Sequence, residues 1–195
     1  MYRLICLLLL IGVIASQGGL GAAGYFSDSK QNPGNTFTAW VATTVNLHPD
    51  SGVDETGSLY SLTPGDLDNL AHSDNSRYTT QDTWEDAYSD DEYLGFGFPD
   101  IPSGVSVLQV SITVEWQRKK DTYDARLRVF DGQGHEQVYA LTLPPKNEDG
   151  SETIDVSAFI DTVQKVNGLE VWFQAVSSKG ETTKHDLIEV EVAYE

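Results

Sequence analysis

The sequence predicts an all-β protein, an antiparallel β-sandwich of jelly-roll type that carries one short helix. Several segments alternate apolar and polar residues with a period of two, which is typical of strands that are buried on one face. Glycine and proline separate these segments at distances typical of hairpins, and only one segment has helical spacing. The 195 residues, of which 39% are hydrophobic, suffice for a leader and one folded domain.

The chain begins with the features of a secretory signal peptide, which we place at residues 1–24. Arg3 precedes an apolar run over residues 4–15, which is too short to span a bilayer but has the length of a signal-peptide core. Ala22 and Gly24 are small residues of the kind that a signal peptidase requires, so we expect cleavage between Gly24 and Tyr25. Cleavage one or two residues earlier and an uncleaved anchor are the alternatives. Because no second run of spanning length follows, the mature protein is predicted to be secreted or held at the cell surface, with no membrane contact of its own.

The clearest strand runs from Leu108 to Gln117, where five apolar residues alternate with five polar ones. Within another strand, Val171 and Phe173 point to the face opposite Trp172. Strands with the same kind of alternation are expected at residues 93–98, 125–130, 137–143, 169–175 and 188–194. The sandwich is therefore assigned to residues 48–195.

The single predicted helix interrupts this series of strands. Phe159, Val163 and Val166 lie at i, i+4 and i+7 after Ser157, a residue type favoured at helix starts, and Gly168 provides a stop. We expect this helix to cover one end or edge of the sandwich.

Two polar stretches, residues 51–57 and 66–92, are expected to be loops or to contain few buried side chains. The second contains a dense acidic run, formed by Asp82, Glu85, Asp86, Asp90, Asp91 and Glu92. Such a run is usually a solvated loop, and the alternating oxygen ligands and turn glycine of an EF-hand calcium site are missing. We therefore assign no metal ligands here, and calcium binding by the acidic run is the alternative.

The overall charge excludes several classes of partner. The formal net charge is −18, with an isoelectric point near 4.3, so the surface repels phosphate backbones and anionic lipid headgroups. Nucleic acid is therefore not an expected partner. Cys6, the single cysteine, lies in the leader, so the mature domain has no disulfide or thiolate chemistry.

The segment that follows the leader resembles a known export junction. Residues 23–29 read AGYFSDS and residues 34–39 read GNTFTA, which resembles the SipW-dependent signal junction of TasA-like and camelysin-like secreted proteins. Residues 61–66, SLTPGD, resemble the Leu-x-Pro-Gly-Asp turn of that family. The chain departs from the family pattern after Ala39, where residues 40–47 read WVATTVNL in place of Gly-Thr-Leu-Asp-Leu.

This resemblance implies a secreted structural subunit of extracellular fibres or biofilm matrix. Residues 25–47 then form an N-terminal segment and first strand that could be donated to a neighbouring subunit, because an open sheet edge can accept an added strand. Tyr25, Phe26 and Phe37 are the side chains expected to fill the acceptor's pockets in such a homopolymer, which could also include other matrix subunits. The alternative is that residues 36–47 form the first strand of the chain's own sandwich.

The sequence contains no motif that argues for an enzyme, so we predict no catalytic residues and no cofactor. His48, His72, His135 and His185 are scattered and form no His-Glu-x-x-His arrangement, so they are predicted to be surface or loop histidines. No serine lies in a Gly-x-Ser-x-Gly elbow, and phosphate-binding glycine loops are absent.

A second function hypothesis is a carbohydrate-binding or adhesion module that does not polymerise. Trp84 and Trp172 are the proposed glycan contacts, with Tyr88 and Tyr123 as further exposed aromatic candidates for a sugar-stacking platform. Packing within or against the sandwich is the competing interpretation of Trp172.

Overall fold

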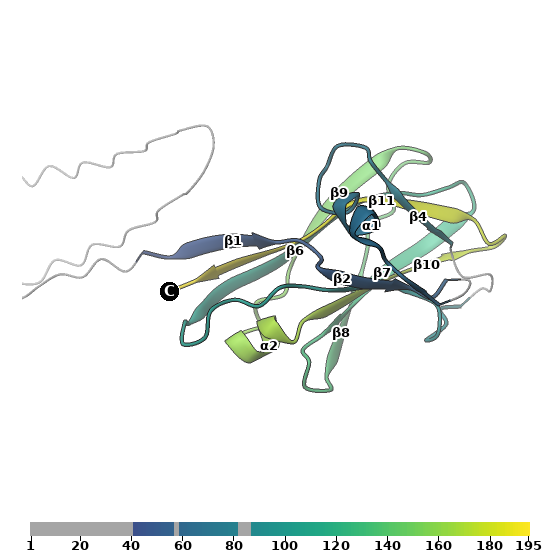
Figure 1. Ribbon diagram of the computed structural model, residues 1–195. Coiled ribbons are helices and arrows are strands. Elements are labelled where there is room, and N and C mark those ends of the chain that lie inside the picture. Colours follow the sequence, from purple (N-terminus) through teal and green to yellow (C-terminus); the bar gives the residue numbers. More distant parts are fainter. Residues whose placement is uncertain (1–40, 57–58, 82–86) are drawn as a thin grey trace, which may run out of the picture.

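The computed structural model describes residues 41–56, 59–81 and 87–195, and these form two antiparallel β-sheets packed face to face (Figure 1). Consecutive strands pass repeatedly from one sheet to the other, as in a jelly roll. The predicted fold class, an all-β antiparallel sandwich, is therefore confirmed.

Sheet A contains five of the described strands around the long strand β11. Its strands are β1 (Thr43–Leu47), β11 (Thr182–Tyr194), β6 (Val107–Gln117) and β9 (Asp149–Asp155), in that order, with β4 (Tyr78–Gln81) also paired to β11. All of these pairs are antiparallel.

Sheet B contains six of the described strands and carries a groove on its outer face. In order across the sheet, its strands are β3 (Tyr60–Ser61), β2 (Ser51–Asp54), β5 (Leu94–Gly97), β10 (Glu170–Ser177), β7 (Thr122–Phe130) and β8 (Glu136–Ala140).

The core lies between the sheets and is built from the inward residues of the alternating strands. Trp116 on β6 packs edge-on against Phe173 on β10, with 5.1 Å between their ring centroids, so the two sheets meet in an aromatic contact. The fully buried apolar side chains around this pair include Val110, Ile112, Val114, Leu127, Val129, Val171, Ile188, Val190 and Val192. Leu108 shares the parity of the β6 core residues but is 48% exposed, because it lies near the end of the strand.

One polar cluster links the two sheets at the end of β2. The Asp54 carboxylate is only 8% exposed and accepts hydrogen bonds from the Tyr78 hydroxyl at 2.8 Å and the Thr80 hydroxyl at 3.1 Å. It also accepts from the backbone N–H and hydroxyl of Thr56, at 2.9 and 2.6 Å. Since β2 belongs to sheet B and β4 to sheet A, Asp54 ties the sheets together through polar contacts.

The structure contains two short helices in the described residues, where the sequence predicted one. Helix α2 (Val163–Asn167) begins later than expected, because Thr162 rather than Ser157 caps it. Ser157 instead accepts from the Val110 backbone N–H and donates to the Val110 carbonyl. Gly168 ends the helix as predicted.

Helix α1 (Pro64–Asp68) forms where the Ser61–Asp66 motif predicted a turn. Thr63 and Asp66 form a reciprocal capping box: the Asp66 carboxylate accepts from the Thr63 N–H at 2.8 Å, and the Thr63 hydroxyl accepts from the Asp66 N–H at 3.3 Å. Pro64 occupies the first turn, where its missing N–H costs nothing. The cap thus fixes a helix beside strand β3.

The polar stretches contain strands that the sequence did not reveal. β2 lies within residues 51–57, which were predicted as a loop, and β4 lies within the polar stretch 66–92, which was expected to contain few buried side chains. No strand was predicted at the position of β9. β9 is an edge strand whose only apolar side chain, Ile154, is half-buried, so it has no hydrophobic alternation to detect.

The N-terminal strand pairs within its own chain. β1 runs antiparallel to β11, with Val45 opposite Val192, and Leu47 is buried in the core. For residues 43–47 this agrees with the alternative in which the strand completes its own sandwich. Tyr25, Phe26, Phe37 and the signal peptide lie outside the described residues.

Candidate functional site: a groove on the outer face of sheet B

The outer face of sheet B has a gap in its side chains along strand β5. The strand alternates Leu94 and Phe96, which point into the core, with Gly95 and Gly97, which point outward. Gly95 lies between Val53 on β2 and Trp172 on β10, and its lack of a side chain leaves room above the strand, which the Tyr93 ring partly fills. The two glycines therefore form the floor of a groove.

Tyr93 folds over this floor and stacks on Trp172. The two rings are parallel to within 4°, with 3.7 Å between their centroids. A Cβ added to Gly95 would lie 2.9 Å from the Tyr93 ring and 3.2 Å from Trp172 Cδ1, so the stack requires glycine at this position. Because Trp172 occupies one face of the Tyr93 ring, the opposite face is directed toward Val53 and the β2 side of the groove.

Trp172 also contacts two side chains of β7. Phe130 lies 4.4 Å from it, centroid to centroid, and the Arg128 guanidinium lies 5.2 Å from its ring centroid. Trp172 therefore supports Tyr93 and borders the groove, while Tyr93 offers the accessible aromatic face.

The groove has a volume of about 530 Å³, within the range of small-ligand sites. On the side away from Trp172 it is bordered by α1, through Pro64 and Leu67. Its polar lining comes from Asp50, Ser51, Ser61 and Glu170, together with the Tyr93 hydroxyl. A site with one aromatic wall, one apolar wall and several hydroxyl and carboxylate groups suits a polyhydroxylated ligand.

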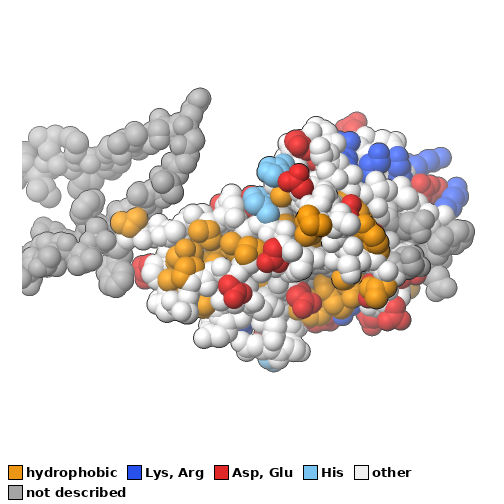
Figure 2. Space-filling model, viewed as in Figure 1, with side chains coloured by type: hydrophobic (Ala, Val, Ile, Leu, Met, Phe, Trp, Pro, Cys, Tyr) orange, Lys and Arg blue, Asp and Glu red, His pale blue; other side chains and the backbone are white. Residues whose placement is uncertain are grey.

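The groove is electrostatically negative. Asp50 and Glu170 are exposed at its rim, and none of the described lining residues is Lys, Arg or His. Burial, followed by the carboxylates of Glu55 and Glu170, raises the pKa of Tyr93, so its hydroxyl stays protonated. In the space-filling view, acidic side chains lie among hydrophobic ones near β2, whereas Lys and Arg gather mainly at the upper right (Figure 2).

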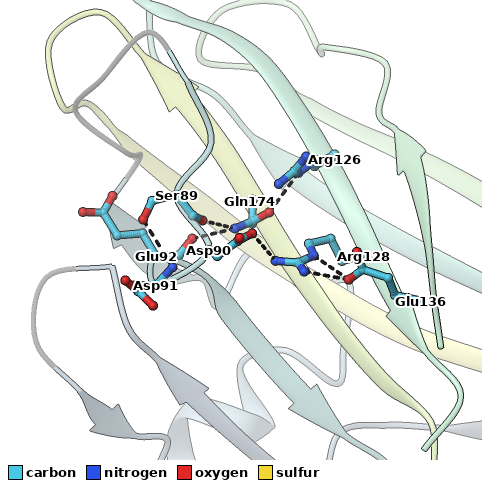
Figure 3. A network of polar contacts seen from close by, with 8 residues as sticks. All are labelled: Ser89, Asp90, Asp91, Glu92, Arg126, Arg128, Glu136 and Gln174. Carbon is cyan, nitrogen blue, oxygen red and sulfur yellow. Dashed lines mark hydrogen bonds and ion pairs between the residues drawn. The ribbon is translucent and has the colours of Figure 1, made fainter. Parts of the chain in front are cut away.

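A strap formed by residues 87–93 holds the aromatic wall in place (Figure 3). Gln174 on β10 donates from Nε2 to the backbone carbonyls of Ser89 and Glu92, at 2.6 and 3.0 Å. Arg128 on β7 pairs with Asp90 at 2.9 Å and with Glu136 at 2.6 Å. Gln174 and Arg128 thus hold the strap in place, and the strap positions Tyr93 at the groove.

The strap also revises the expectation for the acidic run. Asp82, Glu85 and Asp86 lie outside the described residues. In the second half of the run, Asp90 and Asp91 are exposed on a loop, as predicted, but the loop is anchored to sheet B. Tyr88 lies under the Arg126 guanidinium, 3.8 Å from ring centroid to Cζ, and burial raises its pKa. Arg126 and Arg128 on β7 hold this part of the run against sheet B. The order of residues along the chain does not reveal such contacts.

Of the candidate glycan contacts that lie in the described residues, only Trp172 is found at the groove. Trp172 borders the groove on the predicted outward face, half-buried, and it is covered by Tyr93 rather than by a helix. Trp84 lies outside the described residues. Tyr88 packs in the strap, and Tyr123 is exposed on β7 but does not line the groove. The sequence pattern assigned Tyr93 to a strand but not to a site. The spacing of Tyr93 from Gly95 and Gly97, two and four residues, would have placed all three on the same face of that strand.

Among the histidines, the prediction of a surface or loop position is wrong for His185. It is fully buried on β11, where it packs edge-on against Phe173 and lies 3.0 Å from the Thr183 hydroxyl. The strand period breaks at a bulge between His185 and Leu187, which hid its inward direction from sequence analysis. His48 and His72 stack on each other at the surface, 6.0 Å apart.

The described residues contain neither a metal-binding cluster nor a membrane-spanning helix. In that part of the chain, no group of three or more His, Cys, Asp or Glu side chains is placed to hold a metal ion. Neither of its helices has the length and apolar character needed to cross a membrane.

Comparison with protein-family models and with curated sequences gave no match. Among solved structures, the chain is similar to a carbohydrate binding module from glycoside hydrolase family 9 (Cel9A) of Ruminococcus flavefaciens FD-1, with 18% identity over 61% of this chain and 98% of that one, at a TM-score of 0.32. It is also similar to the CBM22-1 xylan-binding domain of Paenibacillus barcinonensis Xyn10C, with 11% identity over 74% and 96% of the two chains, at a TM-score of 0.33. Identities and TM-scores this low establish no shared function, so a function can be inferred only from the residues of the groove.

Proposed function

We propose that this protein is a non-catalytic carbohydrate-binding module and that the groove over Gly95 and Gly97 is its binding site. The observation that carries this proposal is the Tyr93 ring, which stacks on Trp172 through one face and lines the groove. A pyranose ring stacks well on an aromatic face, since its axial C–H groups meet the electron-rich ring. Hydroxyls of the sugar can donate to Asp50 and Glu170 and exchange hydrogen bonds with Ser51 and Ser61.

The exposure of the carboxylates in this site suits binding of a sugar without its hydrolysis. A glycosidase requires a carboxyl group that is shielded enough to stay protonated, opposite a second carboxylate. Asp50 and Glu170 are both exposed, so neither has the apolar surroundings that an acid catalyst needs. Polymerisation through Tyr25, Phe26 and Phe37 stays a prediction that the described residues do not address.

Replacing Tyr93 tests the proposal. The protein is titrated by calorimetry with hexasaccharides of glucose, xylose, N-acetylglucosamine, glucosamine and galacturonate. For a hexasaccharide that binds, we expect Tyr93→Ala to weaken affinity about tenfold or more, because the stacking surface is lost. Tyr93→Phe retains the ring and is expected to retain most of the affinity, and Tyr123→Ala removes an exposed tyrosine outside the groove as a control. If no sugar binds, or if Tyr93→Ala binds as well as the unmodified protein, the proposal is wrong.

Filling the groove floor provides an independent prediction. A Cβ at residue 97 would lie 2.5 Å from Ser51 Oγ, a hydroxyl that can rotate away, so Gly97→Val is expected to fold normally in this strand. The valine methyls would occupy the floor between Ser51 and Glu170, and we expect about a tenfold loss of hexasaccharide affinity. Ala140→Val, the same kind of change on exposed β8, should alter neither binding nor melting temperature. Full affinity in a folded Gly97→Val protein would show that the sugar does not bind over Gly97.

A further inference from the structure

Two carboxylates flank the glycine at the end of the groove floor. Gly97 lies opposite Ser51 on one side and opposite Glu170 on the other, so the Glu170 side chain stands beside the gap that Gly97 leaves. On the other side, Asp50 donates its N–H to the Gly97 carbonyl at 3.1 Å. Asp50 Oδ1 lies 4.0 Å from the position that a Cβ of residue 97 would occupy. The space above Gly97 is therefore bounded by carboxylates on two sides.

Neither carboxylate is neutralised by the described part of the chain. There, Asp50 accepts one side-chain hydrogen bond, from Ser51 Oγ at 3.1 Å, and Glu170 takes part in no ion pair. Arg128, a cation on the outer face beside Trp172, is already paired with Asp90 and Glu136. The negative charge at Gly97 is thus available to a ligand.

The aromatic platform sets where a ligand would meet this charge. Tyr93 lies over Gly95, and Gly97 is the next outward position along β5, about 7 Å further on. A sugar ring stacked on Tyr93 therefore extends its substituents, or the next ring of the chain, into the space between Asp50 and Glu170. The Ser51 hydroxyl adds a hydrogen-bonding group at the same place.

We infer that the groove selects glycans carrying a free ammonium group, namely unacetylated 2-amino sugars, over neutral glycans and over uronates. This inference rests on the proposed function. An ammonium above Gly97 would be attracted by two carboxylates at short range, whereas the carboxylate of a uronate would be repelled by both. An acetamido group in place of the ammonium loses the charge while keeping the same sugar backbone.

The test compares glucosamine hexasaccharide with its N-acetylated counterpart and with galacturonate hexasaccharide, by calorimetry in about 0.05 M salt. We expect the unacetylated sugar to bind about tenfold more tightly than the acetylated one, and the galacturonate not to bind measurably. Raising the salt to about 0.5 M should reduce the preference, because screening weakens exposed ion pairs. The double variant Asp50→Asn/Glu170→Gln should lose the preference, so that the acetylated and unacetylated sugars bind it with equal affinity, whatever the substitutions do to the affinity that the two sugars share.

A control is needed because a chain with a net charge of −18 attracts any oligocation. The variant Glu148→Gln/Glu191→Gln removes the same amount of charge at exposed positions outside the groove and should keep the full preference. Equal affinity for the acetylated and unacetylated sugars, or a preference that survives Asp50→Asn/Glu170→Gln, would overturn the inference while leaving carbohydrate binding intact. A lack of binding to all the sugars would instead overturn the proposed function.

Discussion

Lowering the pH from 7 to 4 is expected to reduce the free energy of unfolding by about 3 kcal/mol through His185 alone. Complete burial lowers the pKa of His185 to about 3 in the folded protein, from 6.5 in an unfolded chain. Between these values the unfolded chain binds a proton that the folded chain does not, so acid favours unfolding. The contribution of His185 to stability is complete above about pH 6.5 and is lost progressively as the pH falls toward 3.

The measurement is urea unfolding at several pH values for the unmodified protein and for His185→Gln. The variant cannot titrate at this position, so its free energy of unfolding should fall much less steeply between pH 6.5 and pH 4.5. This comparison of slopes is independent of any stability that the substitution itself removes. Parallel curves for the two proteins would show that His185 is not the group that couples protonation to unfolding.

Replacing Asp54 by alanine is expected to lower the free energy of unfolding by about 3 kcal/mol. The substitution removes the acceptor for Tyr78 and Thr80 on β4 and for Thr56, in a region where Thr80 is 4% exposed. Buried donors without an acceptor lose their hydration and gain nothing in return. Because these bonds join sheet A to sheet B, the loss also loosens the contact between the sheets at this end.

Asp54→Asn serves as the matched variant, since its amide oxygen can still accept part of these bonds. We expect thermal unfolding to place its melting temperature between those of Asp54→Ala and the unmodified protein. A control such as Thr79→Ala, on the exposed side of β4, should melt within a degree or two of the unmodified protein. A melting temperature for Asp54→Ala equal to that of this control would contradict the role of Asp54 as the link.

The sequence predicts the central strands well because their environment imposes a period of two. β6, β7, the first half of β10 and the second half of β11 are each buried mainly on one face, so apolar residues must alternate with polar ones. β9 and β4 are held mainly by backbone hydrogen bonds to a long neighbour, and their side chains carry no such pattern. Edge strands of this kind can be recognised only once the partner strand is known.

The outward direction of Trp172 was predictable, but the groove was not. Asp50 and Glu170 lie 120 positions apart in the chain. They lie on either side of Gly97 only because β2, β5 and β10 pair in a particular register. Residue spacing within one strand carries no information about that register. The alternation of Tyr93, Gly95 and Gly97 does indicate a bare outward face, and it is the part of the site that can be recognised from sequence.

Mapping a bound sugar by NMR tests most directly whether this groove is a carbohydrate site. The backbone amide signals of the labelled protein are followed while the tightest-binding hexasaccharide is added. We predict shifts concentrated at Tyr93 and along β5, with weaker ones at 51–53 on β2 and 170–172 on β10. Shifts confined to the outer face of sheet A, around Thr113 and Glu189, or no shifts at saturating sugar, would contradict the account.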